Sequence, residues 1–271
     1  MHKILNASYC AHFDDYDLLL AAANAVPGTG LELGCYFDKP GFMENQAANL
    51  DRFAAYPMTL HGPFTDVECA AEPGSPEREK MIDTWKRAFD VYEQFNASSI
   101  VLHTHHMRDI PEEDKEMLRD YAVDTILELA EIAQERKVNM TVENVGHWVK
   151  NNTLFNEEQF IDLFHALPDS VGALLDVGHA LINRWDITHV ICTLNTRIRS
   201  YHLHNNDGCG DTHRPMFEAG NRYSEAEMLN LLELTNKYSP DADWILEYAP
   251  GSHISRNLLV KDLSVLKQLN R

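Results

Sequence analysis

Short apolar runs alternate with longer stretches of mixed polarity along the whole chain. The short runs are rich in Val, Ile and Leu and are bounded by turn-forming residues, which is typical of buried strands. In the longer stretches apolar residues recur at spacings of three and four, which predicts amphipathic helices. The predicted strands are residues 3–7, 31–35, 58–62, 99–104, 140–144, 173–177, 199–205 and 244–248.

Helix starts are indicated by capping residues between these runs. Ser75, Asn156 and Ser224 each precede a first turn that carries acidic residues, a combination that favours a helix N-terminus. The stretch 111–136 has the most regular helical spacing, whereas the region after Asn183 contains several poor helix formers. The predicted helices start near Asp14, Asn45, Ser75, Pro111, Asn156, Asn183, Ser224 and Ser255.

Strict alternation of strands and helices predicts parallel βαβ units. Eight such units in 271 residues match a (β/α)8 barrel of the TIM type, an α/β fold of about 250 residues. An open, doubly wound sheet is the alternative, and the number of units favours the barrel. No linker or shift in composition divides the chain, so we expect one domain over residues 1–271.

Composition narrows the class of protein. The formal charge is 23 − 42 = −19, which disfavours nucleic acid as a partner because nucleic-acid binders usually carry a basic surface. No apolar run reaches the roughly 18–20 residues of a membrane helix, and the first residues lack the pattern of a signal peptide. Five scattered cysteines without a CxxC pair are typical of reduced thiols. We therefore expect a cytoplasmic protein with no membrane partner.

Residues with metal-ligating side chains end six consecutive predicted strands. In a barrel of this type, the carboxyl ends of the strands form the active-site rim. One such histidine or acid alone would more often be a hydrogen-bonded loop residue or a solvated one, but six at equivalent positions indicate a shared site. The residues are His61, His103, Glu143, Asp176, the pair His202 and His204, and Glu247.

A second collection of such side chains lies in the loops after the sixth and seventh strands. His179 follows Asp176 by three residues, while Asp211 and His213 are two residues apart. Crowded carboxylates repel one another unless a cation or histidines offset them. Mixed imidazole and carboxylate ligands suit zinc, manganese or iron, so the sequence predicts a divalent metal site, with zinc or manganese as the expected ion.

Four motifs, read together, resemble the xylose isomerase-like TIM-barrel superfamily. They are VEN at 142–144, DVGH at 176–179, HLHNND with the following DTH and EAG at 202–220, and LEY at 246–248. This superfamily includes sugar isomerases and epimerases, and also the endonuclease IV group (AP endonuclease family 2). The resemblance extends from about residue 30 to 250 and is more specific to the superfamily than to any one activity.

The resemblance implies two ligand sets, for one to three ions in total. In the epimerase branch one metal is held by Glu143, Asp176, His202 and Glu247, and the two glutamates also move protons. The endonuclease IV group uses three zinc ions. There the second would lie on His61, His103 and Glu143, and the third on His179, Asp211 and His213.

One position departs from the superfamily pattern, which often has Asp where this chain has Asn205. From this difference we expect altered tuning of the site by its surroundings rather than loss of the site. The resemblance leaves His204 as a supporting or substrate-binding residue.

Three functions are compatible with this pattern. A sugar isomerase or epimerase, or a related lyase, would remove a proton next to a carbonyl, with Glu143 and Glu247 as bases and a metal-stabilised enediolate. A multinuclear zinc phosphodiesterase or other hydrolase is the alternative, and all nine ligand positions are filled for it. A non-catalytic metal-stabilised barrel is the third, but structural zinc sites are usually closed rather than set in an open barrel mouth. The acidic charge favours the first, on a small carbohydrate-like substrate.

Further side chains are expected at the mouth of the barrel. Candidate substrate contacts are His204, Trp148 and Arg214. Stacking on a sugar is a second expectation for aromatic residues, although each is individually more typical of packing. These aromatic residues are Phe37, Phe64, Trp148 and Trp185, and the cations placed to reach a phosphate are Lys150, Arg184, Arg214 and Arg222.

Overall fold

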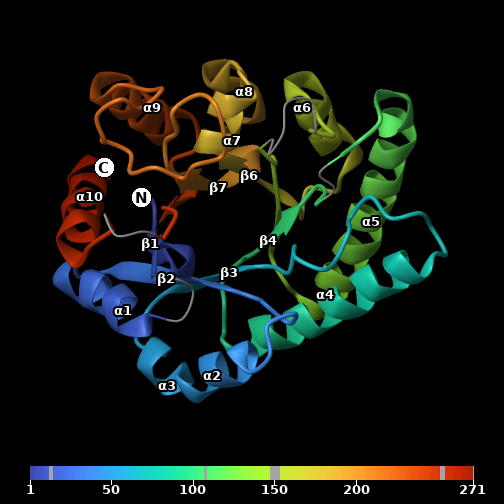
Figure 1. The fold of residues 1–271 in the computed structure, drawn as a ribbon, viewed down its shortest axis with the longest axis horizontal. Helices are drawn as coiled ribbons and strands as arrows, with labels where there is room; N and C mark the ends of the chain where they lie inside the picture. Colours follow the sequence, from blue (N-terminus) through green and yellow to red (C-terminus); the bar gives the residue numbers. More distant parts are fainter. Residues whose placement is uncertain (12–14, 107–108, 147–152, 251–253, 271) are drawn as a thin grey trace.

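The protein is a closed (β/α)8 barrel. The computed structural model describes residues 1–11, 15–106, 109–146, 153–250 and 254–270. Its eight strands are parallel, each pairs with the next along the chain, and β8 pairs with β1 to close the ring (Figure 1). The predicted barrel is therefore confirmed and the open sheet is excluded.

The strands are short and almost fully buried, as expected for the inner wall of a barrel. Their bounds differ from the predicted ones by at most two residues at each end, because strand ends carry the weakest sequence signal. The strands are β1 Ile4–Ala7, β2 Thr29–Gly34, β3 Met58–His61, β4 Ile100–His103, β5 Met140–Glu143, β6 Gly172–Asp176, β7 Ile198–Leu203 and β8 Asp243–Leu246.

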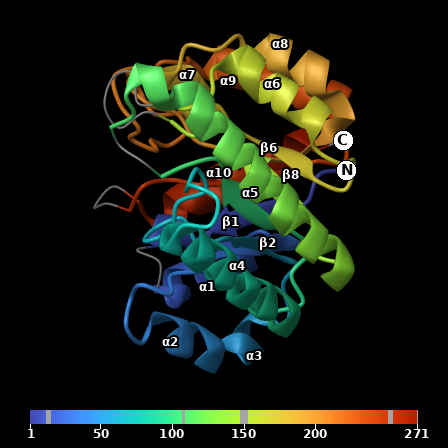
Figure 2. The same ribbon diagram turned by 90° about the vertical axis from the view of Figure 1, so that its right-hand side faces the viewer.

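The helices form an outer layer around these strands, with the long α4 and α5 side by side on one flank (Figure 2). Ser75, Asn156, Ser224 and Ser255 each cap the helix predicted to start there. The helices are α1 Tyr16–Ala25, α2 Phe42–Ala48, α3 Leu50–Phe53, α4 Pro76–Gln94, α5 Lys115–Arg136, α6 Glu157–Ala166, α7 Val177–Ile182, α8 Ile187–Leu194, α9 Glu225–Tyr238 and α10 Arg256–Leu269.

Two predicted helix starts are wrong. The second predicted helix begins at Phe42 rather than Asn45. The sixth predicted helix, expected from Asn183, is two short helices, and Asn183 is the residue that ends α7. Asp186 then caps α8 through its side chain, which accepts from the His189 backbone. The start of α7 was not predicted because Asp176, the last residue of β6, is itself the residue that caps α7. No loop separates the strand from the helix.

The interior of the barrel is sealed below the rim by an apolar layer. Leu5, Ala7, Val101, Leu174 and Ile245 pack together there, and Tyr9 covers them from the rim side. The outward-facing strand residues pack against the helices in one large core. The apolar layer excludes water beneath the rim residues, and the strands hold those residues rigidly. Sites built on rigid elements are more precise than sites on loops.

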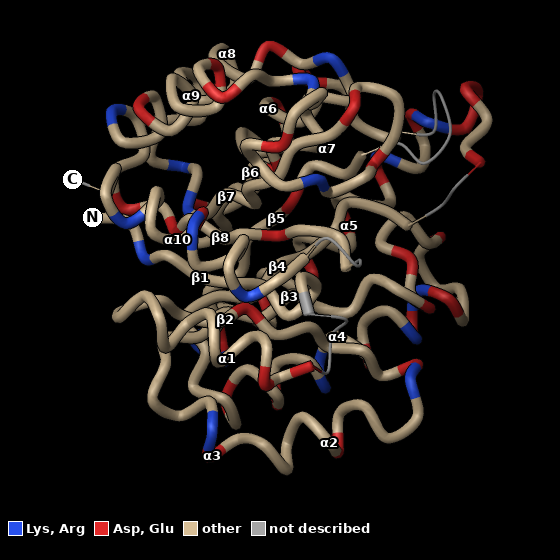
Figure 3. The backbone as a smooth tube through the Cα atoms, turned by 60° about the vertical axis from the view of Figure 1, so that its left-hand side comes forward, with Lys and Arg blue, Asp and Glu red and all other residues tan. Residues whose placement is uncertain are grey.

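Charges are spread over the outer layer, with Asp and Glu in excess (Figure 3). The five cysteines are free thiols, three of them buried. Of the helices that the structure describes, none is long and apolar enough to cross a membrane.

Candidate metal centre and active site

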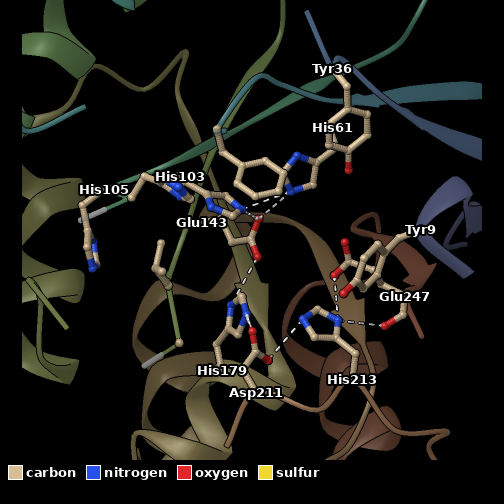
Figure 4. Close-up of a pocket in the computed structure, with 14 residues that line it drawn as sticks. Tyr9, Tyr36, His61, His103, His105, Glu143, His179, Asp211, His213 and Glu247 are labelled. Atoms are coloured by element: carbon tan, nitrogen blue, oxygen red, sulfur yellow. Dashed lines mark hydrogen bonds and ion pairs between the residues drawn. The ribbon is translucent and has the colours of Figure 1, made fainter. Parts of the chain in front are cut away.

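The rim of the barrel surrounds a pocket that is open to solvent on one side and whose cavity volume is about 80 Å³. Histidines and acids from six strands or the loops that follow them converge in it (Figure 4). The described lining residues are Tyr9, Tyr36, His61, Phe64, His103, His105, His106, Glu143, Val145, Gly146, His179, Asp211, His213 and Glu247.

At the bottom of the pocket lies a central group, defined as Glu143, Asp176, His202 and Glu247. Nδ1 of His202 lies 3.3 Å from a Glu143 oxygen, 3.6 Å from an Asp176 oxygen and 3.1 Å from a Glu247 oxygen. Three strands, β5, β6 and β7, and the residue after β8 therefore bring four metal-type ligands to one point. Three carboxylates around one imidazole nitrogen form the donor set of a divalent cation.

A β3–β4 group, His61 and His103, adjoins the central group through Glu143. The two Nε2 atoms are 3.1 Å apart, and they lie 3.6 and 3.2 Å from Oε2 of Glu143. Oε2 is buried and accepts no well-directed hydrogen bond from any described residue. At this spacing, the two imidazole nitrogens and the Glu143 oxygen, to which no described residue donates a well-directed hydrogen bond, could together bind a cation.

A loop group, His179, Asp211 and His213, forms the other wall. Nε2 of His179 and Nε2 of His213 lie 3.2 and 3.1 Å from the two oxygens of Asp211. Nδ1 of His179 donates to the Asn144 carbonyl at 2.8 Å, and Nδ1 of His213 donates to the Glu247 carbonyl at 3.1 Å. These hydrogen bonds leave both Nε2 atoms free to bind a cation, the usual arrangement for ligating histidines.

Attraction between the carboxylates and the histidines of the site keeps the carboxylates ionised although they are buried. Burial alone would raise the pKa of Glu143, but His202 and His103 outweigh it and hold that pKa well below its usual range. Burial would lower the pKa of His202, but Glu247 and Glu143 outweigh it and raise that pKa. Burial would lower the pKa of His213, but Asp211 outweighs it and raises that pKa to about 9. Protons on histidines thus balance the carboxylates in the protein alone, and a divalent cation would balance them equally well.

Glu32, which the sequence patterns did not single out, fixes the central histidine. Its side chain from β2 is buried, and one oxygen lies 2.9 Å from Nε2 of His202. The other oxygen accepts from the Thr59 hydroxyl at 3.0 Å. This pair turns Nδ1 of His202 toward the three carboxylates and makes it a better ligand. The available signal was the Glu between two leucines in LELGC, a charge that a fully buried strand does not tolerate without a partner.

Aromatic side chains line the open half of the pocket. Phe64 packs against the rings of His61 and His103, as its sequence position allowed. Tyr9 and Tyr36 were not anticipated, and burial raises the pKa of Tyr9 to about 12, so its hydroxyl stays protonated. Phe37 and Trp185 pack against the hydrophobic core instead.

Two of the expected substrate contacts do not lie at the pocket. Arg214 pairs with Glu218 at 2.9 Å and does not line the pocket, so the structure does not bring it to the site. His204 is fully buried behind Asp176 and likewise does not line it. Trp148 and Lys150 lie outside the described residues.

Asn205 serves the loop rather than a ligand. Its amide nitrogen donates to the carbonyls of Met216 and Tyr223 at 3.1 and 2.9 Å. Its oxygen accepts from the backbone N–H groups of Asn206 and Tyr223. With its backbone also paired to Arg214, Asn205 anchors the loop that carries Asp211 and His213. An Asp could not make the two donations, which accounts for Asn at this position.

Solved structures of similar fold cover nearly the whole chain. A D-tagatose 3-epimerase-like protein aligns with a TM-score of 0.78 at 17% identity, covering 98% of this chain and 96% of its own. A zinc-bound IolI protein aligns at 0.74 and 16%, with 98% and 96% covered. An AP endonuclease, family 2, from Brucella melitensis aligns at 0.72 and 15%, with 96% and 98% covered.

Several of the structural neighbours are sugar epimerases or epimerase-like proteins, with an AP endonuclease family 2 member among them. At these identities the likeness shows the fold alone. No curated protein matches the sequence. The family model for the xylose isomerase-like TIM barrel matches residues 20–269, and the chain therefore belongs to that family.

Proposed function

We propose that the protein is a divalent-metal-dependent enzyme that isomerises or epimerises a small carbohydrate-like substrate. The observation that carries this proposal is the central group, in which Glu143, Asp176 and Glu247 surround Nδ1 of His202 at the bottom of an open pocket. The sugar epimerases among the structural neighbours support the same substrate class. Zinc or manganese fits the donors, and the zinc-bound neighbour supports a divalent ion.

Each residue of the central group has a distinct part in this chemistry. A bound cation would act as a Lewis acid toward substrate oxygens. Asp176 and His202, both fully buried, would hold that cation, with His202 oriented by Glu32. Glu143 and Glu247 line the pocket, so their carboxylates can reach a substrate. They would take a proton from the carbon next to the carbonyl and return one.

The pocket lining suits a small polar molecule with apolar faces. Tyr9, Tyr36 and Phe64 offer ring surfaces to sugar C–H groups, while histidines offer hydrogen bonds to hydroxyls. Among the described lining residues there is no Lys or Arg to neutralise a phosphate. Together with the charge of −19, this disfavours nucleic acid as substrate.

A second candidate function, a multinuclear zinc phosphodiesterase, is favoured by one specific observation. The β3–β4 group and the loop group both flank the central group, so all nine predicted ligands lie together. Clustered ions can generate hydroxide and stabilise a leaving oxygen. We place this function second because the described lining offers no Lys or Arg to bind a phosphate alongside the ions, and because the charge of −19 disfavours nucleic acid as substrate.

Replacement of Glu143 by Gln tests the proposal directly. The substitution keeps the size of the side chain but removes a ligand and a base, so turnover of a ketose or polyol by the metal-loaded enzyme should fall by at least about 1000-fold. Glu131→Gln on the exposed face of α5 is the matched control and should leave turnover unchanged. Full activity in Glu143→Gln would place the active site elsewhere, and turnover of phosphodiesters alone would favour the second function.

A further inference from the structure

We propose that His204 is a positioning residue that holds one ligand of the central group and one ligand of the loop group at the same time. This inference rests on the metal-binding part of the proposed function and not on the identity of the substrate. His204 follows β7, and its side chain is fully buried. It therefore acts from behind the ligands rather than from the pocket.

Its contacts reach both groups. Nε2 of His204 lies 2.9 Å from Oδ2 of Asp176, the oxygen that also faces Nδ1 of His202. The flat side of the His204 ring stacks on His213, with ring centroids 3.7 Å apart and an angle of 8° between the planes. One imidazole thus fixes the carboxylate of Asp176 by a hydrogen bond and the ring of His213 by stacking.

Proximity alone would also make His204 a candidate fourth ligand of the loop group. Its donor atom lies within 4.8 Å of those of His179, Asp211 and His213. However, an imidazole nitrogen binds a cation along a lone pair in the plane of its ring. Two nearly parallel rings stacked 3.7 Å apart share no plane, so His204 and His213 cannot hold one ion in this arrangement. The loop group therefore keeps three protein ligands and an open position, as sites that bind water or substrate do.

Gly178 makes this arrangement possible. A Cβ at position 178 would lie 1.9 Å from Cε1 of His204, far inside van der Waals contact. Gly178 lies within α7, where an alanine would otherwise be favourable. The glycine of the DVGH motif thus leaves room for the ring, and Gly178→Ala would displace His204 without altering any ligand.

The expected consequence is a selective loss of metal affinity. Partners that orient metal ligands typically change affinity about tenfold to 100-fold when removed. His204→Leu removes both the hydrogen bond and the stacked ring, so ions on the central group and the loop group should each bind about tenfold to 100-fold more weakly. The contacts of His61 and His103 in the described structure are with Glu143 and with each other rather than with His204, so the β3–β4 group should keep its affinity.

The test is a zinc titration of the full-length protein after chelator treatment, read as zinc bound per chain at buffered free zinc. Circular dichroism of each apo variant reports folding independently. Gly178→Ala should reproduce the loss seen in His204→Leu. Gly210→Ala in the β7–α9 loop is the matched control, because a Cβ there meets nothing within 4 Å. His103→Ala, which removes a ligand of the β3–β4 group, should show the opposite selectivity.

Each outcome decides the matter. Weaker zinc binding in both folded variants, at groups other than the one lost in His103→Ala, supports the proposal. If His204→Leu fails to fold, Gly178→Ala decides alone. Parental affinities in the folded variants would overturn the role of His204 while leaving the proposed function intact. Failure of the parent protein to bind zinc at all would overturn both.

Discussion

At the residue scale, Asn205 illustrates how this site is supported from a distance. Its side chain is fully buried and makes two donations and two acceptances, all to the backbone of its own loop. The substitution Asn205→Asp would point a carboxylate oxygen at the carbonyls of Met216 and Tyr223. The loop that bears Asp211 and His213 depends on those bonds for its shape.

We therefore expect Asn205→Asp to lower the free energy of unfolding by about 2–4 kcal/mol, because two buried acceptors lose their donor and a buried charge gains no partner. Chemical denaturation at neutral pH measures this change. Asn45→Asp on the exposed surface of α2 is the control and should change stability by less than about 0.5 kcal/mol. An equally small change for Asn205→Asp would show that the loop is not anchored there.

The sequence predicted which residues lie at the rim where the fold determines their position. It did not predict residues whose position the fold leaves open. A His or acid that ends a barrel strand must face the rim, which is why His61, His103, Glu143 and Glu247 lie together. Glu32 was missed because an acid in the middle of a strand has no such rule. The burial of His204 depends on the room left by Gly178 in α7, a contact between separate segments that no local sequence pattern encodes.

At the element scale, the junction of β6 and α7 combines two functions in one side chain. Asp176 ends β6 and also caps α7, where Oδ1 accepts from the His179 backbone at 2.6 Å. The positive end of the helix dipole stabilises the carboxylate. The predicted helix start at Asn183 was wrong because a helix N-terminus was expected after a loop, and no loop separates β6 from α7.

The opposite end of the barrel provides a pH-dependent prediction. Asp243 begins β8, and burial, with a smaller contribution from Glu32, raises its pKa to about 6 from an ordinary value of 3.8, while Lys3 at 3.8 Å opposes the effect. The folded protein therefore holds this proton more tightly than the unfolded chain. The resulting stabilisation is fully present below pH 3.8 and is lost as pH rises through about 6.

Asp243→Asn should thus gain stability relative to the parent as pH rises from 4 to 7, by about 1–3 kcal/mol, because each unit of pKa shift corresponds to about 1.4 kcal/mol. Parallel urea denaturation series at several pH values measure the difference. Asp241→Asn, two residues earlier and exposed, should show no such trend. A pH-independent difference for Asp243→Asn would refute the assignment of this group.

At the scale of the whole molecule, the number of alternating elements was enough to favour the barrel over an open sheet, because eight βαβ units in 271 residues match the unit count and usual size of a (β/α)8 barrel. The loops were not predictable to the same degree, since they follow from contacts between distant segments. The charge of −19 belongs to this scale too, because charged side chains are spread over the outer layer with Asp and Glu in excess (Figure 3).

Ion binding should stabilise the whole fold, because the ligands come from several strands and loops that separate on unfolding. Zinc at 100 times its dissociation constant should add about 2.7 kcal/mol per site and raise the melting temperature. Thermal denaturation with and without zinc measures the shift. Glu143→Gln should show a smaller shift than the parent, and an unchanged shift would place the bound ion outside this site.

The metal content of the protein purified without added metal or chelator, measured by elemental analysis, tests the candidate metal centre most directly. We predict at least one divalent ion per chain, zinc or manganese, that is lost in Glu143→Gln. About one ion would fit the central group alone, as expected for epimerase chemistry. About three zinc ions would fit all three groups and direct the first assays to phosphodiesters. A protein that contains no metal and takes none up on reconstitution would contradict metal-dependent chemistry at the rim of the barrel.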